Sequence, residues 1–360
     1  MSDRPHILWL DDPLAPRNAA LGGKFSSLAE SFAAELPVPP GFGITTYAYR
    51  DFMAAAGLEA EARRVREVCA TLAPERMGKE TAGLLESIAT ASLPDGLEEA
   101  IRTAYAELER RSGTAGVPVA VRSSGESEDL AGASFAGQYE TFLWISGIDA
   151  VLEHVRACWS GMFGETVLSY KSNGESAISK GDFAICVGIQ QMVEARSAGV
   201  IFTLNPITGD RSKIAIESCW GLGEGVVRGD VNPSQFLADK VTMDVLKRAI
   251  ATQDEEYRFD IESEAVGLFP VDAERRDAPS LSDDEVIALA RLAKGIEADR
   301  GAPQDIEWAI GKDGTIAILQ VRPETAWSGK EAKPILKVKS PIDHVLMRMG
   351  GGASPSGHNG

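Results

Sequence analysis

The segment that most constrains the fold lies near the end of the chain, where residues 305–310 and 316–322 have the pattern of two strands. The sequence Lys312-Asp313-Gly314 between them is typical of a hairpin turn. Strand and turn sequences also alternate from residue 183 to residue 240. With such short connections, this half of the chain is predicted to form a mixed sheet.

Polar side chains gather on one face of each hairpin strand. Because side chains alternate across a sheet, Asp305 and Glu307 share one face, and Gln320 and Arg322 share one face of the partner strand. Two acids, an amide and a guanidinium are costly to bury together. Their burial becomes favourable if Mg²⁺, held by oxygen ligands, bridges them to phosphates while Arg322 neutralises the remaining charge. The alternative is a surface ion-pair ladder without a ligand.

The rest of the chain alternates between helical and strand patterns and predicts an α/β (α+β) protein with a helical layer at its N-terminal end. The helix over residues 17–35 ends at a proline-rich breaker run, 36–41. Helices are also expected after 45–46, in three stretches of 59–111, within 149–171 and after 282–285, and strands are expected at 117–124, 138–145, 183–193, 199–204, 213–219 and 235–239.

The charge of the chain narrows its possible ligands. With 53 acidic and 36 basic residues, the formal charge is −17, which disfavours binding to nucleic acid. An anionic small ligand would then need a local basic pocket or a divalent metal ion. The length of 360 residues and the hydrophobic fraction of 44% indicate a globular protein of two lobes or one elaborate α/β domain.

Nothing in the sequence predicts a signal peptide, a membrane-spanning segment or a redox motif. The first apolar run is too short, and acids come too early, for a signal peptide. A cytoplasmic enzyme or enzyme subunit is expected, without nucleic-acid or membrane partners. The cysteines are widely spaced, form no CxxC pair and are expected to be buried free thiols: Cys69, Cys158, Cys186 and Cys219.

A candidate phosphate-binding loop follows the strand that ends at Ser124. Arg122 in this strand supplies a fixed cation. The small-residue loop 132–137, which contains Gly132, Ser134 and Gly137, has backbone N–H groups that can surround an anion. Taken alone, such a loop is more often an ordinary turn, so its significance depends on the neighbouring motifs.

Lys24 is a second candidate cation, and it follows Gly22 and Gly23 near the first turn of the helix over 17–35. Asn18 and Phe25 occupy positions at which a Walker A loop requires glycine and serine or threonine. Any nucleotide is therefore bound by another architecture.

Two further segments suit the remaining parts of a nucleotide. Gln190, Gln191, Met192 and Val193 combine amides with apolar side chains at a strand end, which fits the edge and face of an adenine. Glu217 ends another strand, and the glycines of the turn 221–225 after it permit close approach of backbone to ligand.

Together these motifs resemble the ATP-binding domain of the phosphoenolpyruvate synthase and pyruvate phosphate dikinase family. The resemblance covers roughly residues 17 to 326 and depends on many matches in the same order. They are Leu21-Gly-Gly-Lys24, Val38-Pro-Pro-Gly-Phe42, Val121-Arg-Ser-Ser124, Ala133-Ser-Phe-Ala-Gly-Gln138, Gly199-Val-Ile-Phe-Thr203, Trp220-Gly-Leu-Gly-Glu224, Asn232-Pro233, Asp305-Ile-Glu-Trp308 and Leu319-Gln-Val-Arg-Pro-Glu324.

The resemblance implies an ATP-grasp fold and a role for each motif. Lys24 and Arg122 would contact phosphates beneath the 132–137 loop, Glu307 and Gln320 would bind Mg²⁺, and Arg322 would assist transfer. Members of the family pass the β-phosphoryl group of ATP to a histidine on a mobile domain, giving AMP and phosphate. Such a reaction needs mainly positioning and charge neutralisation.

Full-length members of the family continue into a phosphohistidine domain, whereas this sequence stops first. Its own histidines, His6, His154, His344 and His358, lie outside every motif. The carrier histidine is therefore expected on a separate partner subunit, as in phenylphosphate synthase, with phenol as the small-molecule acceptor. A two-component phosphoenolpyruvate synthase acting on pyruvate and a non-catalytic nucleotide sensor are the alternatives.

Three units are expected along the chain. Residues 1–195 would form an N-terminal ATP-grasp lobe with the helical layer and the phosphate-binding loop, and 196–327 a C-terminal lobe with the metal-binding hairpin. Residues 328–360 form a basic, Gly/Ser-rich tail that is either a solvated linker or a docking arm for another subunit.

Overall fold

The computed structural model describes residues 4–125, 140–169, 171–172, 175–176 and 184–327. Within them the strands form two large sheets in which every pairing is antiparallel, rather than the mixed sheet that the sequence predicted. The five-stranded sheet has the order β1 (Ile7–Trp9), β2 (Gly41–Ile44), β7 (Ile185–Gln191), β3 (Val119–Gly125) and β4 (Thr141–Ile145). The six-stranded sheet has the order β11 (Val245–Ala249), β10 (Ser234–Asp239), β9 (Lys213–Trp220), β8 (Ala195–Phe202), β14 (Gln304–Gly311) and β15 (Ile316–Pro323).

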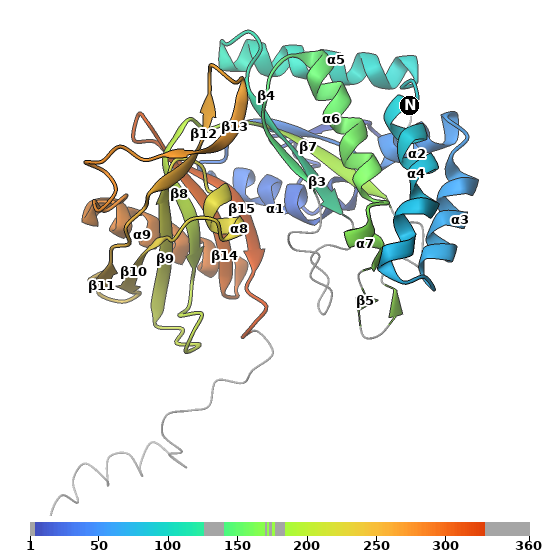
Figure 1. Cartoon of the computed structure of the whole chain (residues 1–360). Helices are drawn as coiled ribbons and strands as arrows, with labels where there is room; N and C mark the ends of the chain where they lie inside the picture. The colour runs from blue at the N-terminus through green and yellow to red at the C-terminus, as the bar shows by residue number, and fades with distance from the viewer. Residues whose placement is uncertain (1–3, 126–139, 170, 173–174, 177–183, 328–360) are drawn as a thin grey trace, which may run out of the picture.

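Two smaller hairpins accompany the large sheets. One pairs β12 (Glu255–Asp260) with β13 (Ala265–Pro270), and the other pairs the short strands β5 (Lys171–Ser172) and β6 (Glu175–Ser176). Figure 1 shows the β12–β13 hairpin beside β4, between the two large sheets.

The predicted helical layer is present and covers the five-stranded sheet (Figure 1). The buried apolar side chains of its helices form one core with that sheet, in which the Trp159 and Phe52 rings stack with centroids 4.7 Å apart. Its helices are α2 (Thr46–Ala55), α3 (Glu59–Cys69), α4 (Pro74–Thr90), α5 (Asp95–Ser112), α6 (Ile148–Gly161) and α7 (Glu165–Ser169).

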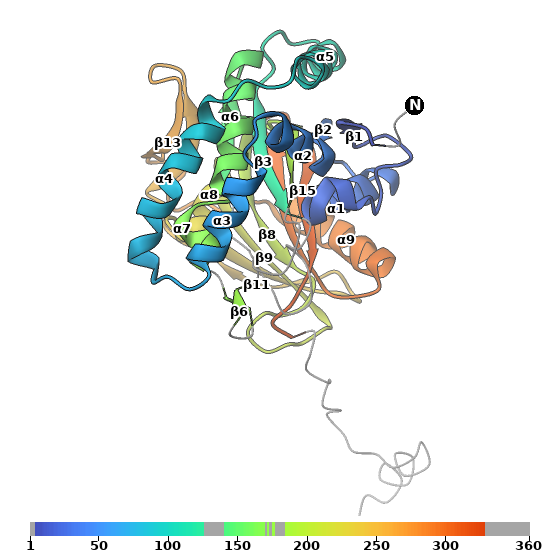
Figure 2. The same cartoon turned by 90° about the vertical axis from the view of Figure 1, so that its right-hand side faces the viewer.

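A second core lies between the six-stranded sheet and two helices, α1 (Gly22–Ala33) and α9 (Asp283–Arg300). A 3₁₀ turn, η1 (Ala19–Leu21), leads into α1, and Phe25 and Leu28 on the buried face of α1 pack in this core. Figure 2 shows α1 near β15, and it also contacts β3 and β7 of the other sheet. Helix α1 therefore joins the two sheets.

The start of α9 has a local cause in the sequence. Ser282 and Glu285 form the predicted capping box, in which each side chain satisfies a backbone N–H of the first turn. No helix in the described part of the chain is long and apolar enough to cross a membrane.

Candidate functional site

A cavity of about 1000 Å³ opens between the two large sheets. One wall comes from β3, β4 and β7, and the other from β8, β14, β15 and the short helix α8 (Glu224–Arg228). Most of the residues that the motifs singled out line it: Lys24, Arg122, Gln190, Gln191, Met192, Val193, Glu307, Gln320 and Arg322. Segments far apart in the sequence thus converge on one cavity.

Of the remaining candidates, Glu217 does not line this cavity, and the other three are not described. Gly132, Ser134 and Gly137 lie outside the described residues. Glu217 is not among the lining residues, although its register places it in one cross-strand row with Val200 and Glu307. Its carboxylate accepts a hydrogen bond from Gln235 Nε2 at 3.1 Å instead. Contact between Glu217 and a nucleotide remains a prediction.

Arg122 links the two walls. Its Nη2 donates to Glu307 Oε2 and to Gln320 Oε1, each at 3.1 Å, and its Nη1 donates to the Leu319 carbonyl at 2.8 Å. The Arg122 side chain is 12% exposed and that of Glu307 23%. Glu307 therefore pairs with a cation from the opposite wall of the cavity and not with a neighbour in an ion-pair ladder along the hairpin.

Lys24 lies in the first turn of α1, which is attached to both sheets. The backbone N–H of Phe25 donates to Ser124 Oγ at 3.2 Å, and Ser27 Oγ donates to the Val321 carbonyl at 2.6 Å. Because Val321 lies between Gln320 and Arg322 on β15, α1 holds Lys24 in a fixed relation to both polar residues of that strand.

Asp305 and Arg322 form a second pair at the hairpin. Arg322 donates to Asp305 Oδ2 from Nε at 2.9 Å and from Nη2 at 2.7 Å. Burial raises the pKa of the Asp305 carboxyl, and the neighbouring guanidinium counteracts part of that rise. Asp305 thus holds Arg322 at the edge of the cavity, where its charge can meet a phosphate.

Glu307 and Gln320 have the chemistry of a Mg²⁺ site. They are direct register partners on β14 and β15, and their side-chain oxygens both face Arg122 Nη2. Among the described residues, no three His, Cys, Asp or Glu side chains come together as a metal cage. Mg²⁺ commonly takes one or two protein oxygens and completes its shell with phosphate and water, so this donor pair fits the ion.

Gln190 of β7 places a polar side chain on the wall that β3, β4 and β7 form. Its side chain is 2% exposed, and its Nε2 has no hydrogen-bond partner within the described structure. Buried donors are normally paired, so an unpaired one that lines a cavity is suited to a ligand acceptor. This position fits the predicted contact with the edge of an adenine.

Two further parts of the walls were not predicted from the sequence. Thr141, Phe142 and Leu143 of β4 line one side, and Val227 and Arg228 of α8 line the other. The strand over 138–145 was expected, but nothing in its composition indicated that part of it would line a cavity while Phe142 also packs against the core.

A model of the pyruvate phosphate dikinase AMP/ATP-binding domain matches residues 18–341 of this chain. The chain belongs to this family. Phosphoenolpyruvate synthase from Aeropyrum pernix is 38% identical over 98% of the chain and 47% of its own length. The prodigiosin synthesizing transferase PigC from Serratia marcescens is 39% identical over 90% of the chain and 33% of its own length.

The chain spans less than half the length of these relatives. Membership of a family of AMP/ATP-binding domains and the two-sheet architecture agree with the predicted ATP-grasp fold. Binding of the nucleotide in the cavity between the sheets remains a prediction. Among solved structures, an ATP-grasp ligase, PsnB complexed with precursor peptide PsnA2 and AMPPNP, is 11% identical, covers 70% of this chain and 50% of its own chain, and has a TM-score of 0.20.

Proposed function

We propose that this chain is the ATP-binding component of a dikinase-type phosphotransferase that passes the β-phosphoryl group of ATP to a histidine. A bond from phosphorus to a histidine nitrogen forms and the bond between the α- and β-phosphates breaks, so AMP leaves. Water hydrolyses the bond between the β- and γ-phosphates, and the γ-phosphate leaves as inorganic phosphate. The observation that carries the proposal is the convergence of Arg122, Glu307 and Gln320 in the cavity of a chain from this family.

The side chains supply positioning and charge neutralisation. Lys24, Arg122 and Arg322 line the cavity and can oppose the negative charge of the phosphates. Mg²⁺, when bound by Glu307 and Gln320, would supply further positive charge at the phosphate oxygens.

We propose a separate subunit as the source of the accepting histidine. His6 pairs with Asp51 at 2.7 Å, and His154 Nδ1 lies 2.8 Å from the Ala150 carbonyl. Neither lines the cavity, and His344 and His358 lie outside the described residues.

Phenol and pyruvate are the two candidate acceptors of the phosphoryl group from that histidine. A separate histidine subunit would fit a phenylphosphate-synthase-like complex acting on phenol. The relative from Aeropyrum pernix is a phosphoenolpyruvate synthase, and its similarity favours pyruvate. A nucleotide sensor without catalysis is the alternative function, and the retention of Arg122, Glu307 and Gln320 in one cavity argues against it.

The test is transfer of label from β-³²P-labelled ATP with Mg²⁺, using the full chain with and without the separately purified candidate subunit. We expect acid-labile phosphohistidine on the added subunit, and subsequent labelling of pyruvate or phenol identifies the acceptor. Glu307→Gln should abolish labelling, whereas the same change at the exposed Glu75 on α4 should preserve it. Tight ATP binding without labelled histidine on either protein would support the sensor instead.

A further inference from the structure

The β12–β13 hairpin contacts both sides of the cavity without lining it. No residue of the hairpin, which the structure describes in full, is among the lining residues. Strand β12 nevertheless contacts α8 and β9 on one side, and β13 contacts β4 on the other (Figure 1). The hairpin is thus placed to fix the distance between the walls.

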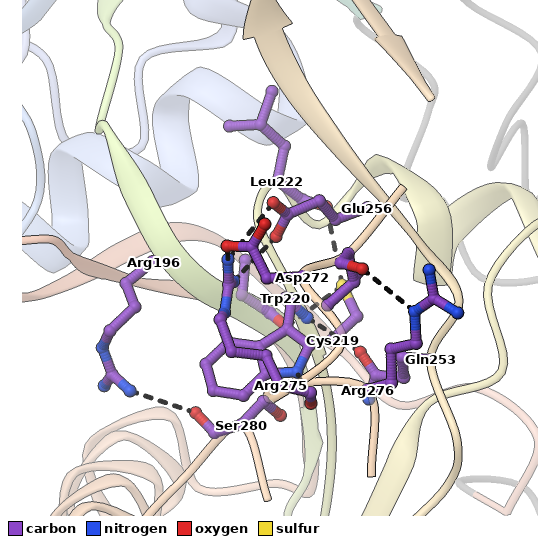
Figure 3. Close-up of polar contacts among 12 residues, drawn as sticks. Arg196, Cys219, Trp220, Leu222, Gln253, Glu256, Asp272, Arg275, Arg276 and Ser280 are labelled. Atoms are coloured by element: carbon purple, nitrogen blue, oxygen red, sulfur yellow. Dashed lines mark hydrogen bonds and ion pairs between the residues drawn. The ribbon is translucent and has the colours of Figure 1, made fainter. Parts of the chain in front are cut away.

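On the side of the six-stranded sheet, the hairpin holds the turn that leads into α8. Leu222, which lines the cavity, donates its backbone N–H to the Tyr257 carbonyl at 2.8 Å. Beneath the turn, the Trp220 indole donates to the Arg275 carbonyl at 2.9 Å, and the Arg275 guanidinium binds Glu256 of β12 at 2.8 Å (Figure 3).

The backbone of this turn is equally constrained. Trp220 donates its backbone N–H to Gln253 Oε1 at 2.9 Å, as Figure 3 shows. Gly221 has a φ of +70°, and a Cβ there would lie 2.3 Å from the Tyr257 carbonyl oxygen. The turn and β12 therefore behave as one rigid unit on this wall.

On the opposite side, the same strand reaches β4. The ring of Phe259 stacks on that of Trp144, with centroids 5.1 Å apart and planes at 11°. Trp144 follows Thr141–Leu143, which line the cavity. Its φ of +62° is an outlier for a bulky side chain and costs free energy unless the surrounding contacts compensate for it.

We propose that Trp144 and Phe259 are positioning residues that hold the two walls of the nucleotide cavity at the separation that ATP requires. This inference depends on the proposed function of the cavity. Arg122 connects the walls through Glu307, but β4 is an edge strand that, among the described strands, pairs in its sheet with β3 alone, across a register shift. The stack with Phe259 supplies the contact that β4 lacks on its outer side.

Loss of the stack should lower the fraction of molecules in which both walls are in place. The apparent dissociation constant of a ligand rises in inverse proportion to that fraction. We expect Trp144→Leu and Phe259→Leu each to raise the dissociation constant for ATP by about two- to tenfold, the range equivalent to one aromatic pair. The double variant should bind no more weakly than the weaker single variant, because both changes remove the same contact.

Isothermal titration of the full chain with ATP and Mg²⁺, paired with thermal unfolding of each variant, tests the proposal. Phe259→Tyr retains the ring and should bind like the wild type, as should Ile261→Ala at the hairpin tip, where the side chain is 83% exposed. Variants that unfold earlier but bind ATP like the wild type would reduce the pair to a structural role and overturn the proposal. Equal weakening of ATP binding by Phe259→Tyr and Phe259→Leu would overturn it as well. A wild-type chain that fails to bind ATP would refute the proposed function instead.

Discussion

Arg122→Met is the substitution that most directly tests how the two walls are joined. The change keeps a side chain of similar length and removes the guanidinium that donates to Glu307, Gln320 and the Leu319 carbonyl. Glu307 would then lose the cation that compensates its charge inside the cavity. We expect lower stability together with loss of phosphoryl transfer.

The magnitude follows from burial. Removing one partner of a fully buried ion pair costs about 3–5 kcal/mol. Glu307 is 23% exposed, so water screens part of the uncompensated charge. We therefore expect Arg122→Met to lower the free energy of unfolding by about 2–3 kcal/mol. Adding Glu307→Gln removes the isolated charge and should restore about 1 kcal/mol of that loss.

Urea unfolding of the two single variants and the double variant, followed by circular dichroism, measures this coupling. Arg248→Met is the matched control, because Arg248 of β11 pairs with Asp283 of α9 at an exposed site. Its loss should cost less than about 1 kcal/mol. The double variant should remain inactive in the β-labelled ATP assay. If its loss of stability equals the sum of the single losses, or if Arg122→Met transfers label at the wild-type rate, the reasoning fails.

Three more substitutions or treatments test the scaffold. Gly22→Ala should destabilise the protein by more than about 1 kcal/mol in urea unfolding, because Gly22 has a φ of +65° and a Cβ would lie 2.2 Å from the Ser124 carbonyl oxygen. Gln253→Leu should cost about 2 kcal/mol in the same assay, since it leaves the buried Trp220 N–H unpaired, and an unchanged midpoint would contradict this. Burial raises the pKa of Cys158 and Cys219 to about 12, so a thiol reagent at pH 8 should label them only after unfolding. The pKa of each thiol is higher in the folded protein than in the unfolded chain. The stability that depends on the protonated thiols is therefore complete below pH 9 and should be lost as the pH rises toward 12.

Most elements of the fold were predictable because their patterns are strong. The helical face of α1, the capping box of α9 and the turn of the β14–β15 hairpin each have a local chemical cause in the sequence. The strands β1, β2, β11, β12 and β13 were not predicted. Two of them are three or four residues long, and β2 begins at Gly41, the last residue of the breaker run 36–41. In β11 and β12 many side chains are exposed, so hydrophobic alternation is weak.

In the candidate site, the positions that a local rule fixes could be predicted, and the contacts that depend on the tertiary fold could not. Alternation along a strand places Glu307 and Gln320 correctly, because a hairpin fixes its own register. No local rule could indicate that Arg122, 185 residues before Glu307, would donate to it across the cavity. That contact exists because β3 and β14 belong to different sheets, which α1 joins through Ser124 and Val321.

Positive charges placed on the walls of the cavity allow a strongly acidic chain to bind an acidic nucleotide. Its formal charge of −17 would repel ATP at a distance, and screening limits that repulsion to about 8–10 Å at physiological ionic strength. Inside the cavity, the positive charges of Lys24, Arg122 and Arg322 lie on the walls, each on an element that ordinary packing and hydrogen bonds hold in place. The attraction between ATP and these cations is therefore local, and it depends on the two walls keeping their separation. Affinity for ATP should for that reason respond more to Trp144 and Phe259, which carry no charge, than to any single exposed carboxylate.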